Sequence, residues 1–434
     1  MAITSKEIIS VEQLLTMDLC IPNYQRPYKW TEKNMNQLFN DILEASTKML
    51  SEYRLGTIVI HEHADGKLDI VDGQQRTISL YLIQHVFEDQ LKVQRNKSQI
   101  SKNIREAKRL YQGLNEGERK NFRDYFLEKC RVIVIKIDNE MEAFQFFDSQ
   151  NARGKSLEAH DLLKAYHLRE MRGDSEQTKL ALIEKWEAQL TAELATLFER
   201  YLYRIKTWLK QGNAHYFSKD GVALFKGIPM NEQYNFIQYH KAAYLFIEKF
   251  NGENLQELLA LDALIPFQLD QPVLAGRRFF EYTLYYINLK RQVEKIALEL
   301  LPKAVSPAHT KEQTGTRYVR ELFQTLLLYY YDKFGIQKRN RLIEGLFLQY
   351  SYQLRLIHVQ VQEKSINKYA LGRNERLNER INLFTSIRDA VTPSELEMIM
   401  LDDVTEAQVV EKYQAEKYRA LRDKCGVIID DTEE

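Results

Sequence analysis

Residues 68–80 of the chain read Leu68-Asp69-Ile70-Val71-Asp72-Gly73-Gln74-Gln75-Arg76-Thr77-Ile78-Ser79-Leu80. The short apolar run 70–71 follows turn-forming residues, and from Ile78 onward apolar residues recur at helical spacing. This pattern predicts a strand, a tight turn at Gly73 and a helix. A glycine at such a turn lets the backbone approach a ligand closely, and the first amide groups of a helix attract anions.

Two charged side chains flank this turn. The carboxylate of Asp72 suits a metal ion or a water molecule, and the planar guanidinium of Arg76 suits a phosphate group. An ordinary hydrogen-bonded turn, with Arg76 paired to Asp72, is the other interpretation, because strand–glycine–helix turns are common in α/β proteins. The residues of the turn alone leave both interpretations open.

The composition limits the class of protein. A chain of 434 residues is long enough for two or three domains. The 61 Lys and Arg residues balance the 61 Asp and Glu residues, so any nucleic-acid surface must be a local patch. The three cysteines are far apart and form no metal-ligand spacing, which favours structural thiols in a reducing compartment.

The sequence predicts no membrane partner. Residues 1–6 lack a basic region followed by an apolar one, so we expect no signal peptide. The most apolar later stretch, residues 322–331, is about half the length needed to span a bilayer. We therefore expect a cytoplasmic protein.

Two further segments carry candidate binding residues. Residues 20–30 form an extended segment in which prolines disfavour helix and aromatic and polar side chains alternate. Residues 151–155 form a polar loop with a glycine. The first segment can be a ligand wall or a packed turn. The second can hold phosphate or simply end a helix at Gly154.

The remaining patterns predict an α+β fold. Strands are expected at residues 55–60 and 131–137, a short helix at 8–15 and surface helices within 88–128, whereas no strand is expected after Tyr166. Long helical patterns follow at 180–210, 234–250, 277–301, 318–334, 341–362 and 377–390. We expect a mixed α/β domain at 1–165 and an all-α region, with helical parts at 166–305 and 306–434 that can also be continuous.

Basic and aromatic residues interleave at 201–210 and again at 277–291. Such a mixture suits nucleic acid, with cations on phosphates and rings against bases. A helix that buries its rings and exposes its cations gives the same pattern, and this second interpretation is the favoured one. Histidines 61 and 63 lack a third ligand nearby, so we expect them to be exposed loop residues.

Three motifs occur in one order along the chain: Ile21-Pro22-Asn23-Tyr24-Gln25-Arg26-Pro27-Tyr28-Lys29-Trp30, then Val71-Asp72-Gly73-Gln74-Gln75-Arg76, then Phe147-Asp148-Ser149-Gln150-Asn151-Ala152-Arg153-Gly154-Lys155-Ser156-Leu157. Together with the strand Leu-Gly-Thr-Ile-Val-Ile between the first two, they resemble the N-terminal domain of the GmrSD family. The resemblance covers about the first 165 residues. It implies a small domain with a ParB/sulfiredoxin-like fold.

The resemblance also implies a nucleoside-triphosphate site with Mg²⁺, in a restriction system that attacks modified foreign DNA. By position, Asp72 would orient a metal ion or the attacking water, Gln74 and Gln75 would position water or phosphate, and Arg76 would neutralise phosphate charge. The other implied nucleotide-binding residues are Tyr24, Gln25, Arg26, Gly73, Thr77, Asn151, Arg153 and Gly154. The residues that would ligate the metal remain unknown.

Full-length members of the family often carry a C-terminal HNH nuclease domain with a His-containing motif. Here the last third has only His309 and His358, and neither lies in such a motif. We therefore expect no nuclease centre, and a separate nuclease subunit would make the cut. The chain also lacks a GxxxxGK[ST] loop, which excludes a P-loop NTPase.

The resulting hypothesis is a nucleoside triphosphatase that senses DNA for anti-phage defence. Three alternatives stay open: a regulatory module that binds nucleotide or DNA without hydrolysis, a DNA-nicking nuclease that uses Asp72, and a purely structural subunit. The base preference, the trigger and the oligomeric state are not encoded in any pattern that we can interpret.

Overall fold

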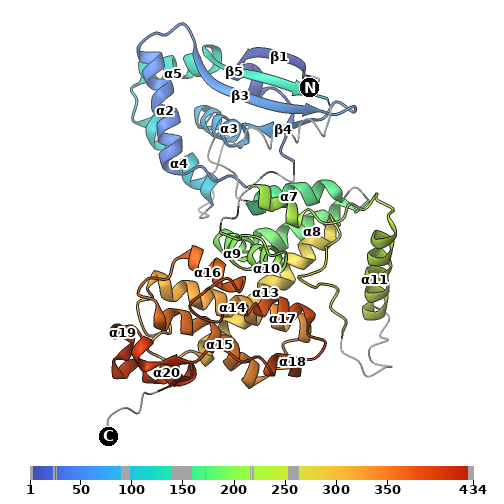
Figure 1. Cartoon of the computed structure of the whole chain (residues 1–434). Helices are drawn as coiled ribbons and strands as arrows, with labels where there is room; N and C mark the ends of the chain where they lie inside the picture. Colours follow the sequence, from blue (N-terminus) through green and yellow to red (C-terminus); the bar gives the residue numbers. More distant parts are fainter. Residues whose placement is uncertain are drawn as a thin grey trace. The chain divides into compact units, whose positions relative to one another are not determined.

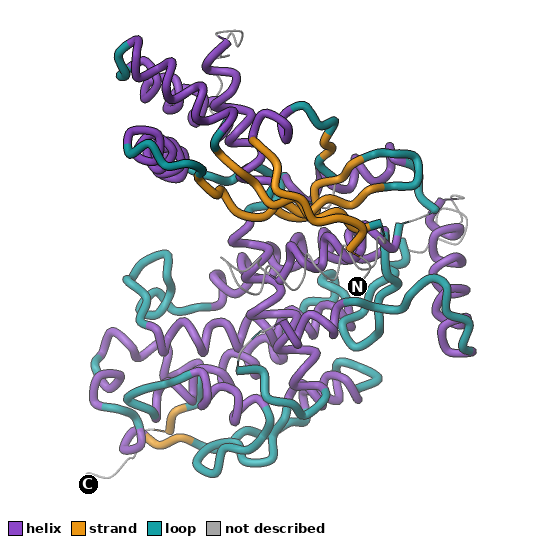
Figure 2. The backbone as a smooth tube through the Cα atoms, turned by 90° about the horizontal axis from the view of Figure 1, so that it is seen from above, coloured by secondary structure: helices purple, strands orange, loops and turns teal. Residues whose placement is uncertain are grey.

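The computed structural model describes residues 3–22, 25, 27–88, 98–138, 159–171, 173–215, 217, 219–252 and 263–428. The chain divides into two compact units, Met1–Leu157 and Glu158–Glu434, called unit 1 and unit 2 below. The first carries a mixed sheet and the second is largely helical (Figures 1 and 2), which confirms the α+β class.

Unit 1 is built on one five-stranded sheet of order β1-β5-β3-β4-β2. Its strands are β1 (Ile3–Ser10), β2 (Leu19–Cys20), β3 (Tyr53–Glu62), β4 (Leu68–Asp72) and β5 (Cys130–Ile137). Strands β3 and β4 form an antiparallel hairpin, and β5 pairs parallel with β3 and antiparallel with β1. The strands predicted at 55–60 and 131–137 are thus confirmed.

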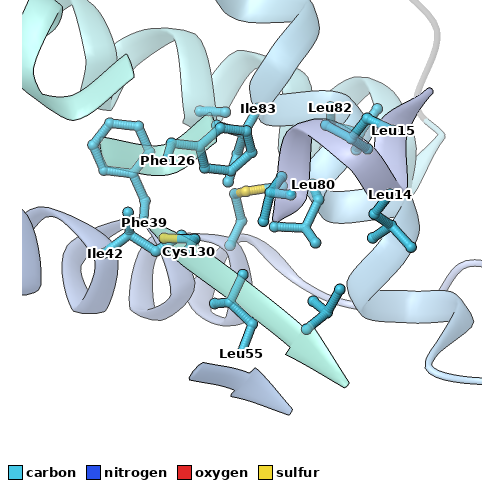
Figure 3. Close-up of a cluster of buried hydrophobic side chains, with 14 of the residues drawn as sticks. Leu14, Leu15, Phe39, Ile42, Leu55, Leu80, Leu82, Ile83, Phe126 and Cys130 are labelled. Atoms are coloured by element: carbon cyan, nitrogen blue, oxygen red, sulfur yellow. The ribbon is translucent and has the colours of Figure 1, made fainter. Parts of the chain in front are cut away.

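The helices of unit 1 pack on this sheet and on one another. They are α1 (Val11–Leu15), α2 (Glu32–Thr47), α3 (Gln74–Glu88), α4 (Gln99–Gln112) and α5 (Glu116–Glu128). Figure 3 shows part of the core, where Phe39 of α2 and Ile83 of α3 meet Phe126 of α5. The rings of Phe39 and Phe122 stack with centroids 4.3 Å apart, so α2 is fixed against α5.

The helix expected at residues 8–15 is shorter than predicted. Residues 8–10 belong to β1, which pairs with β5 from Ile8 to Ser10, and the helix begins only at Val11. Ser10 starts it with a capping box, because its hydroxyl accepts from the backbone of Gln13 while Gln13 accepts from the backbone of Ser10. His61 is also not the exposed loop residue that we expected, since it lies in β3 and is 7% exposed.

Unit 2 contains helices that follow the predicted patterns closely in its middle part. Three of its long helices are α13 (Arg277–Leu300), α14 (Thr314–Phe334) and α15 (Arg341–Ile357). Residues 322–331 of α14 are all buried, so this apolar run is the central helix of the unit. No helix in the described ranges is both long and apolar enough to cross a membrane.

The other elements of unit 2 include one further long helix, α11, and several shorter helices, turns and strands. They are α7 (Ala159–Glu170), α8 (Glu176–Glu187), α9 (Thr191–Thr196), a π-helical turn η1 (Leu197–Leu202), α10 (Tyr203–Leu209), a 3-10 turn η2 (Lys219–Phe225), α11 (Asn235–Gly252), α16 (Glu363–Ala370), α17 (Leu383–Asp389), α18 (Ser394–Glu397), β6 (Val404–Thr405), η3 (Glu406–Gln408), α19 (Glu411–Gln414), η4 (Glu416–Tyr418), α20 (Arg419–Lys424) and β7 (Val427–Ile428).

Two predictions for unit 2 need correction. The helix expected at 180–210 is interrupted at 188–190, and its second part winds through a π-helical turn. The expectation of no strand after Tyr166 is also wrong, because β6 and β7 form a two-residue parallel ladder. Each of these strands is too short to give an alternating pattern in the sequence.

The basic and aromatic residues of 201–210 serve the core. Tyr201, Arg204 and Trp208 are at most 3% exposed, and Arg204 forms ion pairs with Glu321 and Glu363. In the second stretch, Arg278 pairs with Glu281. The rings are thus packed as the favoured interpretation has it, but its expectation of exposed cations is wrong for Arg204, which is buried with its carboxylate partners.

Candidate functional site

The predicted strand–turn–helix lies where expected, with β4 ending at Asp72 and α3 beginning at Gln74. Gly73 connects them with φ +90°, and its amide donates to Oδ1 of Asp72 at 2.8 Å. A Cβ atom on Gly73 would lie 3.0 Å from Cγ1 of Ile58 and 3.2 Å from the carbonyl oxygen of Thr57. The turn therefore requires glycine, both for its dihedral angle and for its contact with β3.

The guanidinium of Arg76 lies against β3 at a second glycine, Gly56. A Cβ atom on Gly56 would be only 2.9 Å from Nη1 of Arg76, so the missing side chain leaves the space that the guanidinium occupies. Gly56 has φ +106° and sits at a bulge between β3 and β5. Nη1 of Arg76 donates to the carbonyl oxygen of Thr57 at 3.3 Å.

The charge of Arg76 is not neutralised by an ion pair with Asp72. Both residues are described, and the contacts of Arg76 within the described ranges are the bond to Thr57 and the longer-range attraction of Asp72. Burial lowers the pKa of Arg76, and the Asp72 carboxylate partly opposes that shift. The Arg76–Asp72 ion pair that the sequence suggested as one interpretation therefore does not form. Most of the five N–H donors of Arg76 can donate hydrogen bonds to an anion.

Gln75 holds a neighbouring segment in place. Its Oε1 accepts from the amide of Lys29 at 2.7 Å and from that of Trp30 at 3.2 Å, and its Nε2 donates to the carbonyl of Pro27. The side chain is 9% exposed. Gln75 therefore braces residues 27–30, called the strap below, against the start of α3.

Gln25 holds its own segment against strand β4 in a similar way. Its Nε2 donates to the carbonyl of Val71 at 2.7 Å and to that of Ile70 at 3.3 Å. Gln74 is buried and its Oε1 accepts from Nε2 of Gln75, while Thr77 is buried with its hydroxyl donating to the carbonyl of Gly73. The structure thus brings six of the predicted residues, 25 and 73–77, together with Asp72 at one turn.

The other candidates cannot be placed. Tyr24 and Arg26 of the first motif lie outside the described residues, and so do Asn151, Arg153 and Gly154 of the third. The structure therefore describes only part of the set that the resemblance brings together.

Some residues that matter here were missed by the sequence analysis. Gly56 was treated only as part of a strand, although an isolated glycine in a strand often marks a close approach of another group. The strap is also fixed by Tyr28, whose hydroxyl lies 2.7 Å from that of Ser79, and by Asn103, which donates to the Tyr28 hydroxyl and to the Trp30 carbonyl. No sequence spacing indicates these long-range contacts.

The donor set at the turn fits a phosphate ester with Mg²⁺. Mg²⁺ commonly takes one or two protein carboxylates and completes its shell with phosphate oxygens and water. Asp72 offers one such carboxylate, and in the described ranges its Oδ2 accepts no hydrogen bond. Those ranges contain no group of three or more His, Cys, Asp or Glu side chains placed to hold a metal ion by themselves.

Neither late histidine forms part of such a group. His309 is an exposed loop residue between α13 and α14, and His358 follows the last residue of α15. Burial lowers the pKa of His358, and nearby Arg376 acts in the same direction.

Two family models match the chain. The model described as GmrSD restriction endonuclease, N-terminal domain, matches residues 6–168, a range that contains the Asp72 turn and the strap. The model described as a family of unknown function (DUF7834) matches residues 178–416, which is more than half of the 434 residues. A comparison with curated proteins finds no match.

These matches confirm the resemblance seen in the three motifs. They also show that the part after the N-terminal domain carries a family of unknown function and not an HNH domain. The N-terminal match indicates a component of a restriction system. The chain thus belongs to the family of unknown function DUF7834, and its residues 6–168 are a GmrSD-type N-terminal domain.

Proposed function

We propose that this chain binds and hydrolyses a nucleoside triphosphate at the turn between β4 and α3. In this proposal the chain is the DNA-sensing component of a prokaryotic, modification-dependent restriction system against phage, acts in the cytoplasm, and relies on a separate nuclease subunit for cutting. One observation carries the proposal: Arg76 is held over Gly56 with its charge unpaired in the described ranges, beside the Asp72 carboxylate.

A half-buried guanidinium without a carboxylate partner favours an anionic ligand. Burial makes its charge costly, and the bond to the Thr57 carbonyl compensates only one of its donors. Two oxygens of a phosphate group would accept two parallel hydrogen bonds from the same guanidinium. The first amides of α3 begin two residues after Asp72, so the helix adds further donors and a favourable dipole for phosphate.

The roles of the side chains follow from their positions. Arg76 would stabilise charge that develops on the transferred phosphoryl group, and Gln74 would orient the attacking water or a phosphate oxygen. Asp72 would hold Mg²⁺, whose chemistry when bound is to neutralise phosphate charge. Gln25 and Gln75 would act as positioning residues, because their amide groups are engaged with backbone.

The test is phosphate release from ATP, GTP, CTP and UTP, with and without DNA. The wild type is compared with Arg76→Gln, Asp72→Asn and the control Arg54→Gln, because Arg54 is exposed and pairs with the nearby Glu52. Losing one transition-state donor typically costs about 3–4 kcal/mol, so Arg76→Gln should lower turnover by more than about a hundredfold.

The outcomes separate the alternatives. Equal turnover in the wild type, Arg76→Gln and Asp72→Asn would rule out hydrolysis at this turn. Binding without turnover, lost in Arg76→Gln, would identify a regulatory module instead. Nicking of plasmid by the lone chain, lost in Asp72→Asn, would identify a nuclease.

A further inference from the structure

A cavity in unit 2 has four lysines among the residues that line it. It measures about 530 Å³ and lies between the loop that joins α13 to α14, the first turn of α14, and residues 412–418. Lys303 and Lys311 line it from the loop, and Lys412 and Lys417 line it from the opposite side. All of these residues belong to one unit and all are described.

The positive charge of this lysine cavity is not balanced by acids. None of its four lysines forms an ion pair with a carboxylate in the described part of the chain. The one acidic residue of its lining, Glu312, is bound in a bidentate ion pair by Arg320. The four lysines and one glutamate of the lining give a formal charge of +3 in a chain whose formal net charge is zero, and Arg320 neutralises that glutamate from outside the lining.

A further cation lies beneath the lining. Arg355 is 5% exposed and its Cζ lies 5.0 Å from the centre of the Tyr413 ring. Its Nη2 and the Nζ of Lys412 both donate to Oε1 of Gln313, so two cations share one neutral acceptor. Burial lowers the pKa of Lys412, and the like charges of Arg355 and Lys417 lower it further. This excess charge favours an anionic ligand.

The aromatic residues indicate which part of a ligand would be recognised. Tyr413 and Tyr418 are 2% and 7% exposed, and the ammonium groups of Lys412 and Lys417 lie 5.3 and 5.1 Å from the centres of their rings. The rings are therefore packed and covered, and they offer no open face on which a base can stack. Lysine ammonium groups contact phosphates without regard to base sequence.

We propose that the lysine cavity binds phosphate groups along the backbone of a nucleic-acid strand. The contact is independent of sequence and is strongest at low salt, because each neutralised phosphate releases counterions. This inference would give the proposed DNA sensor its DNA contact and rests on the proposed function in that respect. Its test needs no nucleoside triphosphate, so nucleic-acid binding at the lysine cavity and hydrolysis at the Asp72 turn can fail separately.

The experiment measures the binding of fluorescently labelled single-stranded and duplex oligonucleotides by the full chain over a range of NaCl concentrations. The variant Lys412→Gln/Lys417→Gln removes two charges from the cavity. The matched control Lys338→Gln/Lys364→Gln removes two charges from exposed lysines elsewhere in unit 2. Circular dichroism checks that both variants fold.

The expected result is weaker binding of the cavity variant to every duplex sequence, with the slope of log K against log salt reduced by about 2 units. The control should keep the wild-type slope. An unchanged slope in the cavity variant, or an equal loss in the control, would overturn the assignment. Binding of ATP or inorganic phosphate by the wild type, with no binding of either oligonucleotide, would overturn the nucleic-acid strand as the ligand.

The two proposals remain distinguishable in this design. If the cavity variant loses DNA binding but still hydrolyses nucleotide in the absence of DNA, the inference holds whether or not DNA stimulates turnover in the wild type. If the wild type binds DNA but hydrolyses nothing, the proposed hydrolysis fails while the lysine cavity stands.

Discussion

Gly56 and Arg76 form a pair in which the smaller residue makes room for the larger. The Cβ of an alanine at position 56 would lie 2.9 Å from Nη1 and 3.2 Å from Cζ of Arg76. Gly56→Ala should therefore displace the guanidinium and remove the expected stabilisation by nucleotide in a thermal-shift assay, as Arg76→Gln should.

Gly66 provides the matched control for this prediction. It also has a positive φ, +86°, but nothing lies within 4 Å of the position of its Cβ. Both alanine variants should lose about 1–3 kcal/mol of stability from backbone strain. Only Gly56→Ala should lose the nucleotide effect, and an equal loss in Gly66→Ala would show that strain alone is responsible.

His167 is a buried histidine that is neutral in the folded chain. Its Nδ1 accepts from the amide of Gly276, so Nε2 carries the proton and donates to the carbonyl of Phe225. The ring also stacks on Phe279 with centroids 3.7 Å apart. Burial, with a smaller contribution from nearby Lys226, lowers its pKa from 6.5 to about 3, although the bond to the Phe225 carbonyl opposes the shift.

This pKa shift predicts acid sensitivity of unit 2. Between pH 6.5 and about 3 the unfolded chain binds a proton at His167 that the folded chain does not, so the free energy of unfolding falls as pH falls. The contribution approaches about 1.4 kcal/mol per pH unit. Urea unfolding from pH 7 to 4.5 should show a smaller slope for His167→Gln, and an identical slope would contradict the assignment.

At the scale of elements, the amide side chain of Gln75 is one of the groups that hold the strap against α3. Gln75→Ala would leave the amides of Lys29 and Trp30 without their acceptor. A hydrogen bond typically contributes about 0.5–1.5 kcal/mol, and two are lost at these part-buried amides, so the variant should lower the stability of unit 1 by about 1–3 kcal/mol. Urea unfolding measures the loss, and hydrogen exchange should rise at residues 28–30.

Gln112 supplies the control for the strap. It is exposed at the end of α4, and Gln112→Ala should change stability by less than about 0.5 kcal/mol. If Gln75→Ala matches this small effect, the strap is held by other contacts, such as that of Tyr28 with Ser79.

Local patterns predicted the main elements of the fold, and contacts distant in sequence account for what they missed. β5 was evident because β-branched residues fill 132–135, and α14 because its apolar run is long. β1 was partly mistaken for a helix, since its last residues continue the apolar spacing of α1. Its pairing with β5, more than a hundred residues away, determines that these residues form a strand.

At the candidate site, too, local patterns were predictable from the sequence and long-range contacts were not. The turn at Gly73 follows from strand, glycine and helix signals that lie next to one another in the sequence. That Gln75 braces a strap 45 residues earlier, and that Arg76 lies over Gly56, depends on tertiary packing. Sequence patterns therefore located the turn, and the structure distinguishes its bracing side chains from those that can meet a ligand.

For the whole molecule, the even charge balance conceals two local features. Unit 1 holds a guanidinium that forms no ion pair among the described residues, beside a carboxylate at the end of β4, and unit 2 holds a cavity with four lysines. A net charge of zero is an average over the chain and gives no information on such sites.

The central claim is that the Asp72–Arg76 turn binds a nucleoside triphosphate. Isothermal titration of the full chain with each of the four nucleoside triphosphates in Mg²⁺ tests it directly, using wild type, Arg76→Gln and Arg54→Gln. We predict that at least one nucleotide binds the wild type and Arg54→Gln with equal affinity, and that Arg76→Gln binds it at least tenfold more weakly, since a charge-assisted hydrogen bond contributes about 1.5–3 kcal/mol. Equal affinity of all three proteins, or no binding of any nucleotide to the wild type, would contradict the claim.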